Sequence, residues 1–122
     1  MVIAMVRVVV PESKRAEVLQ ALRLLRGPTA ARMGCDGFHV YRDDEHENAL
    51  LLLQQWASEA DLDRYIRSDL YSTILAVIET AIEPPDIRFD TIAATAESNW
   101  SRLSARVAPR DEWRAACCEK RG

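Results

Sequence analysis

Residues 49–56 read ALLLLQQW, an apolar run that closes on two glutamines and a tryptophan. An apolar run of this length between polar segments is typical of a strand that is buried on both faces. Residues 43–48, just before it, are polar and predict a hairpin loop, and residues 38–42 predict the preceding strand. The sequence therefore predicts a β-hairpin at the centre of a sheet.

Toward the N-terminus, a strand and a helix precede this hairpin. Residues 2–10 (VIAMVRVVV) are rich in β-branched side chains, which favours a strand. The next helix is expected to begin within residues 11–13, because proline and an early acidic residue suit a helix start. Its apolar stripe consists of Val18, Leu19, Leu22 and Leu25. Gly27-Pro28 is expected to interrupt or end it, with a further short turn over residues 29–33.

Toward the C-terminus, the sequence predicts two short helices and one more strand. Ser58 is a good N-cap for the first helix, and Ser68-Asp69 predicts a break and a new cap. The apolar stripes of the two helices contain Leu62, Tyr65 and Ile66, then Leu70, Ile74, Val77 and Ile78. Pro84-Pro85 ends the second helix, and residues 86–92 alternate as a final strand.

The resulting order, β-α-β-β-α-β over residues 1–94, indicates an α+β ferredoxin-like domain with a four-stranded antiparallel sheet. Helices would cover one face of that sheet, and no element remains for the other. Because the leucine run is apolar on both sides, a monomer would expose a large apolar patch. We therefore expect a homodimer with two sheets packed face to face. A ligand pocket would form between sheet and helices or between the two sheets.

Composition and charge narrow the classes of protein further. The chain has 122 residues and a net charge of −3, so it lacks the basic field of a nucleic-acid-binding protein. Its apolar runs are too short for a membrane span. Three cysteines cannot all pair within the chain, which favours free thiols in a reducing cytoplasm.

Residues 95–122 differ from the rest in charge, with six basic and four acidic residues. We expect a C-terminal extension, either a frayed and partly helical tail or an arm that packs its tryptophans on the partner subunit. The extension also holds Cys117 and Cys118, and the adjacent pair is a poor candidate for a disulfide.

Several segments resemble the antibiotic biosynthesis monooxygenase family over residues 1–94. They are Gly34-Cys35, Phe38, Tyr41-Arg42-Asp43, LQQWASE at residues 53–59, Leu62, Tyr65, Ser68-Asp69-Leu70-Tyr71 and PDIRFDT at residues 85–91. The resemblance implies a dimeric α/β barrel of ferredoxin-like subunits. Characterised members of this family include cofactor-independent oxygenases of polycyclic phenols, quinol oxygenases and haem-degrading oxygenases.

The resemblance also implies roles for single residues. Trp56 matches the tryptophan that lines the pocket of the polyketide-oxidising members. Those members have an asparagine where this chain has Leu52 and a tyrosine where it has Leu62. The histidine of the haem-degrading members corresponds to Leu75, and haem iron needs an axial ligand, so we exclude haem degradation.

Oxygenation without metal or flavin requires a base, a group that stabilises an anion, and a dry pocket. His39 is the candidate base because histidine titrates near neutral pH, and Arg88 and Arg7 are candidates to stabilise an oxyanion. The alternatives are a partly exposed strand histidine and arginines in ion pairs with Asp90 or a neighbouring acid. Arg88 is assigned with His39 to catalysis, and Arg7 to substrate binding.

Trp56, Tyr65 and Tyr71 are the remaining candidates for substrate binding, as stacking or hydrogen-bonding side chains. The alternative for each is a place in the hydrophobic core. We expect no metal site and no cofactor, since the histidines and cysteines lack ligand spacing and there is no glycine-rich phosphate loop.

Two functions remain open. The first is a cofactor-independent monooxygenase that oxidises a quinol or polyphenol with dioxygen. The second is a non-catalytic dimeric barrel that binds a small aromatic metabolite or supports another enzyme. A weaker third alternative is an isomerase or decarboxylase.

Overall fold

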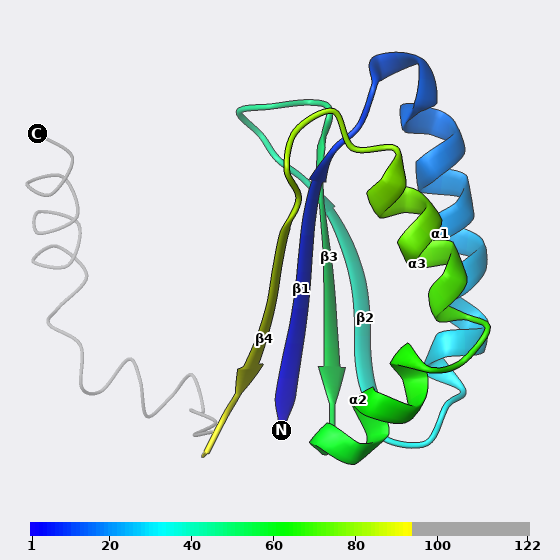
Figure 1. The fold of residues 1–122 in the computed structure, drawn as a ribbon, viewed down its shortest axis with the longest axis vertical. Coiled ribbons are helices and arrows are strands. Elements are labelled where there is room, and N and C mark those ends of the chain that lie inside the picture. Colours follow the sequence, from blue (N-terminus) through cyan, green and yellow to red (C-terminus); the bar gives the residue numbers. More distant parts are fainter. Residues whose placement is uncertain (94–122) are drawn as a thin grey trace, which may run out of the picture.

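The computed structural model describes residues 1–93 as one sheet with helices on one side (Figure 1). The strands are β1 (Val2–Val9), β2 (Cys35–Arg42), β3 (Ala49–Trp56) and β4 (Asp86–Thr91). The helices are η1 (Glu12–Lys14), α1 (Arg15–Ala30), α2 (Glu59–Ile66) and α3 (Tyr71–Glu79). This confirms the predicted α+β ferredoxin-like fold. The C-terminal extension predicted for residues 95–122 lies outside the described residues.

The sheet has the order β2-β3-β1-β4, and all three pairings are antiparallel. Helices α1 and α3 cover one face, and α2 lies at the end of the sheet near the N-terminus (Figure 1). No element of residues 1–93 covers the other face, which we call the open face. Within residues 1–93 no helix is both long and apolar enough to cross a lipid bilayer.

Strand alternation produces the core. Every second residue of β1 and β3 faces the helices and is buried. These residues are Val2, Ala4, Val6, Val8, Leu50, Leu52, Gln54 and Trp56. Val18, Leu22 and Leu25 of α1 pack against them, which confirms the predicted apolar stripe. Burying a valine or leucine side chain contributes about 1.5–3 kcal/mol, so this layer supplies much of the driving force for folding.

Strand β4 is the exception, because all six of its residues are exposed. Ile87 and Phe89 are paired with Val6 and Ala4, so they point to the helix side of the sheet. They nevertheless remain 41% and 49% exposed. The helices therefore leave the space beside β4 partly uncovered.

The structure corrects the predicted end of the first helix. Helix α1 continues through Pro28 to Ala30, instead of ending at Gly27-Pro28. Proline removes one backbone donor, but here it stands in the last turn, where little helix remains to be disrupted. Thr29 in the same turn is fully buried, so the packing of this turn outweighs the proline penalty.

Two turns hold α2 against the end of the sheet. Ser58 caps α2 as predicted, since its hydroxyl accepts a hydrogen bond from the Asp61 backbone N–H at 3.2 Å. Gly34 has φ +85°, a left-handed conformation that favours glycine. Its carbonyl accepts a hydrogen bond from Ala57 N–H at 2.7 Å, joining the start of β2 to the end of β3.

Candidate functional site

The structure divides the six predicted site residues between the two faces of the sheet. Trp56, Tyr65 and Tyr71 lie together on the helix side, in the core. His39, Arg88 and Arg7 lie on the open face, because strand alternation points them away from the helices. One small ligand therefore cannot contact both sets within a single chain.

The helix-side set forms a cluster of three aromatic rings. The ring centroids of Trp56 and Tyr65 are 4.7 Å apart, and those of Tyr65 and Tyr71 are 5.7 Å apart with an edge-to-face geometry. Strand β3 supplies the indole, while α2 and the start of α3 supply the phenols. Such contacts stabilise aromatic pairs by about 0.5–1.5 kcal/mol beyond the area that they bury.

A buried polar network surrounds the Tyr65 hydroxyl. Gln54 Nε2 donates to this hydroxyl at 3.2 Å, and the Thr29 hydroxyl lies 3.1 Å from it. Burial raises the pKa of the Tyr65 phenol, and the two hydrogen bonds offset only part of that rise. Tyr65 therefore stays protonated at neutral pH and acts as a neutral hydrogen-bonding group.

The indole N–H of Trp56 is the polar atom without a partner in this cluster. Trp56 is fully buried, and its Nε1 makes no hydrogen bond within residues 1–93. An unsatisfied buried donor costs about 1–3 kcal/mol, so native proteins rarely keep one without a reason. The Trp56 indole N–H is therefore a buried donor for which residues 1–93 supply no acceptor.

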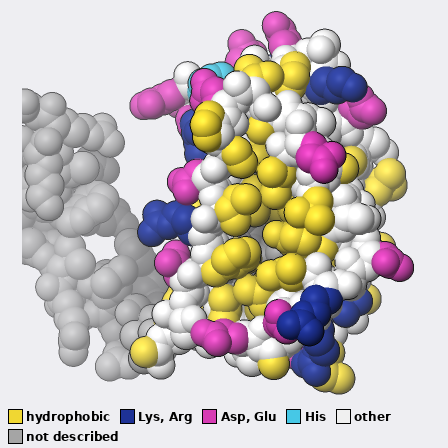
Figure 2. Space-filling model, viewed as in Figure 1, with side chains coloured by type: hydrophobic (Ala, Val, Ile, Leu, Met, Phe, Trp, Pro, Cys, Tyr) yellow, Lys and Arg dark blue, Asp and Glu magenta, His cyan; other side chains and the backbone are white. Residues whose placement is uncertain are grey.

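A groove of about 370 Å³ lies next to this cluster, between the end of the sheet and α2. It is lined by Val2, Glu59, Leu62, Asp63, Ile66, Phe89 and Thr91. Val2 pairs with Trp56 in the sheet, and Leu62 is one helical turn before Tyr65. Hydrophobic side chains gather between β4 and the helices in Figure 2, and the groove belongs to this region.

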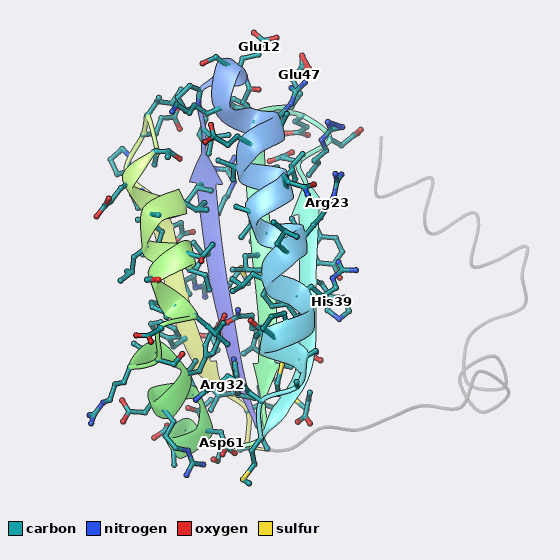
Figure 3. The ribbon with its side chains drawn as sticks, turned by 90° about the vertical axis from the view of Figure 1, so that its right-hand side faces the viewer. Glu12, Arg23, Arg32, His39, Glu47 and Asp61 are labelled. Atoms are coloured by element: carbon teal, nitrogen blue, oxygen red, sulfur yellow. The ribbon has the colours of Figure 1, made fainter. Side chains whose placement is uncertain are left out.

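On the open face, His39 and Arg88 stand in one row across the sheet. His39 pairs with Leu53, Leu53 with Met5, and Met5 with Arg88. Three strand spacings separate the two ends of the row, which corresponds to about 14 Å. Figure 3 shows His39 on the β2 edge of the sheet, pointing outward. The two candidates for catalysis therefore do not meet within one chain.

Both candidate arginines form ion pairs, as the alternative interpretation anticipated. Arg7 lies 3.3 Å from Asp43, and Arg88 lies 4.0 Å from Asp90. The Glu45 backbone N–H and then the Arg7 guanidinium lower the pKa of the Asp43 carboxyl. Both pairs are partly exposed, so they contribute little to stability but reduce the free charge that either arginine offers to a ligand.

A model of the antibiotic biosynthesis monooxygenase family matches residues 1–77. The chain belongs to the antibiotic biosynthesis monooxygenase family. No curated protein matches it. Among solved structures, this family member is similar to an antibiotic biosynthesis monooxygenase at 13% identity and TM-score 0.69, covering 77% of this chain and 100% of the other.

Two further structures resemble this family member. One is a Mycobacterium tuberculosis protein at 22% identity and TM-score 0.70, covering 79% of this chain and 98% of that one. The other is a conserved protein from Methanosarcina mazei at 27% identity and TM-score 0.67, and the match covers 74% of this chain and 91% of that one. At 22% identity, the likeness to the Mycobacterium tuberculosis protein shows the shared fold alone.

Two further residues of the cluster in this family member, Gln54 and Thr29, were not predicted from the sequence. Gln54 lies two residues before Trp56 and so shares its face of the sheet, a signal that strand alternation offered. Thr29 gave no such signal, because a helix end was expected just before it. Both side chains place neutral hydrogen-bonding groups beside the aromatic cluster. Leu52 and Leu62 have no polar side-chain atoms and cannot supply such groups.

Proposed function

We propose that this protein is a monooxygenase that oxidises a quinol or polyphenolic substrate with dioxygen, without metal or flavin. The unpartnered indole N–H of Trp56, in the core behind the Val2 and Leu62 wall of the groove, carries this proposal. A phenolic or quinone oxygen is the acceptor that would satisfy it. The family and its fold support an oxygenase, and the aromatic and apolar side chains of the groove wall support an aromatic substrate.

The reaction needs no outside reductant when the substrate is a hydroquinone. Loss of a proton makes the ring electron-rich enough to pass an electron to dioxygen. One oxygen atom then forms a new C–O bond on the ring, and the other leaves as water. The ring is oxidised to the hydroxyquinone, so the substrate supplies all the electrons. The protein would orient the ring, stabilise its oxygen through Trp56 and exclude water.

Oxygen uptake tests the activity directly. With 1,4-naphthohydroquinone or anthrone, we expect uptake above the rate of autoxidation. Trp56→Phe keeps an aromatic ring but removes the donor, and we expect it to lower kcat by about tenfold to a hundredfold. Leu24→Ala, on the exposed side of α1, serves as the control. Uptake no faster than autoxidation would leave the second function, binding of an aromatic metabolite without catalysis.

The same assay tests the base role predicted for His39. Because His39 lies on the open face, away from the groove, we expect His39→Ala to retain the uptake of the unchanged protein. A loss as large as that of Trp56→Phe would instead assign the chemistry to the open face.

We also propose that the functional unit is a homodimer joined through the open face. Ile3, Met5, Leu51 and Leu53 form an apolar centre there, flanked by His39, Tyr41, Asp86, Arg88 and Asp90 on the two edge strands. An apolar centre with a polar rim is the usual anatomy of a protein interface. The partner sheet would supply the cover that residues 1–93 lack.

Light scattering at micromolar concentration tests the dimer. We expect the mass of two chains for the unchanged protein and of one chain for Leu53→Glu, because a charge at the centre of an interface is strongly unfavourable. Leu24→Glu places the same charge on α1, where the side chain is already 69% exposed, and should leave the dimer intact. A monomeric mass for the unchanged protein would overturn this assembly.

A further inference from the structure

The charged residues that line the groove are both acidic. Glu59 and Asp63 stand one turn apart on α2, above walls made by Val2, Leu62, Ile66 and Phe89. At about 370 Å³, the groove falls within the range of roughly 300–1,000 Å³ that is typical of small-molecule sites. It therefore combines an apolar and aromatic wall with a negatively charged rim.

The two carboxylates differ in their partners. Asp63 Oδ2 pairs with the Arg67 guanidinium at 3.2 Å, so a cation offsets its charge. Glu59 Oε1 accepts a hydrogen bond from the Thr91 hydroxyl at 2.9 Å, and that partner is neutral. This bond joins the first residue of α2 to the last residue of β4 and holds the Glu59 carboxylate at the groove.

We propose that Glu59 makes this groove selective for uncharged, hydroxylated aromatic ligands and against aromatic carboxylates. The inference rests on the proposed function in that it concerns the substrate class of the same site. A ligand hydroxyl would donate to the Glu59 carboxylate while the ring packs against Phe89. An anionic ligand would meet like charge, and the described lining of the groove offers it no cation.

Glu59 also supplies what the helix-side set lacks, a group that can take a proton. Tyr65 and Tyr71 both have a raised pKa because of burial, so neither phenol is a base at neutral pH. A carboxylate at the rim can accept the proton of a bound phenol as that phenol loses an electron to dioxygen. Selectivity and proton acceptance then depend on the same oxygen atoms.

A matched pair of ligands tests the selectivity. 2-Naphthol and 2-naphthoate share one ring system, and at neutral pH the first is uncharged and the second is an anion. Titration calorimetry under nitrogen measures both affinities for the full chain. We expect 2-naphthol to bind at least about tenfold more tightly, as one charge-assisted hydrogen bond and one like-charge contact together imply.

Glu59→Gln keeps the shape and the acceptor for Thr91 but removes the charge. We expect it to reduce the preference for 2-naphthol by about tenfold, mainly through tighter binding of 2-naphthoate. Glu79→Gln, on the exposed end of α3 outside the groove, changes the net charge equally and should keep the preference. Equal binding of the two probes by the unchanged protein, or an unchanged preference in Glu59→Gln, would overturn the inference.

These measurements separate the inference from the proposed function, because binding under nitrogen involves no oxidation. Selective binding without oxygen uptake removes the monooxygenase and keeps Glu59 as the selecting group. Oxygen uptake without selectivity removes the role of Glu59 and keeps the monooxygenase.

Discussion

Replacing Gly34 with alanine is expected to lower the free energy of unfolding by about 3 kcal/mol. The left-handed backbone at φ +85° costs a residue with a side chain about 1–2 kcal/mol, and overpacking adds about 1–3 kcal/mol. An alanine Cβ would lie 2.6 Å from the Asp61 Cβ, which belongs to the rigid part of that side chain. Asp61 cannot move away without losing its contacts with Ser58 and Arg64.

Urea denaturation of the variant and of Gly27→Ala measures this effect. A Cβ at Gly27 meets nothing within 4 Å, and Gly27 is exposed inside α1, so alanine there should stabilise the chain by about 1 kcal/mol. The two substitutions are chemically identical and differ only in place. Equal midpoints would show that Gly34 holds neither the turn nor the position of Asp61.

The Gly34 effect should also depend on pH. The Ser58 hydroxyl and then Arg64 lower the pKa of the Asp61 carboxyl below its ordinary value of 3.8. The contribution of such a group is present above its ordinary pKa and is lost as the pH falls through the lower, folded value. If Gly34→Ala displaces Asp61, the gap in stability between variant and unchanged protein narrows as the pH falls below about 4.

Replacing Tyr65 with phenylalanine is expected to destabilise the chain by about 2–3 kcal/mol, although the ring stays. The change removes the hydroxyl that Gln54 and Thr29 both contact. These two side chains are 2% and 0% exposed, so water cannot replace the lost partner. A buried polar group left without its partner costs about 1–3 kcal/mol.

Thermal or urea unfolding measures this loss, with Tyr41→Phe as the control. Tyr41 is 48% exposed on β2, and losing its hydroxyl should change stability by less than about 0.5 kcal/mol. Adding Gln54→Leu and Thr29→Val to Tyr65→Phe removes the whole network and should restore much of the stability, since none of these three side chains then leaves a buried polar group unpaired. A Tyr65→Phe protein as stable as Tyr41→Phe would contradict the network.

Local patterns were sufficient to predict most of the fold. The strand at residues 49–56, the cap at Ser58 and the break at Ser68-Asp69 each depend on neighbours in the sequence, and each is present in the structure. The predicted burial of that strand on both faces is not seen within residues 1–93, where its burial alternates. The start of β2 was predicted too late, at Phe38 instead of Cys35, because the turn residues before Phe38 obscured the irregular pairing between Cys35 and Gly37.

The candidate site was only partly predictable, because its contacts join distant segments. Thr29 meets Tyr65 across 36 residues, and their contact depends on how α1 and α2 pack. The separation of His39 from Arg88 depends on strand order, which placed their strands at opposite edges. Residue type indicated aromatic chemistry, but only the packed structure shows which side chains share a face.

Strand β4 pairs only with β1, and its side chains are all exposed, yet it supplies Phe89 and Thr91 to the groove. Little buried surface opposes its detachment, so we expect it to open by local unfolding at lower free energy than the central strands. Any ligand held between Phe89 and α2 would restrain that opening. The hydrogen-exchange rates of the β4 amides therefore report occupancy of the groove, and every substitution that loosens β4 weakens ligand binding without touching the ligand.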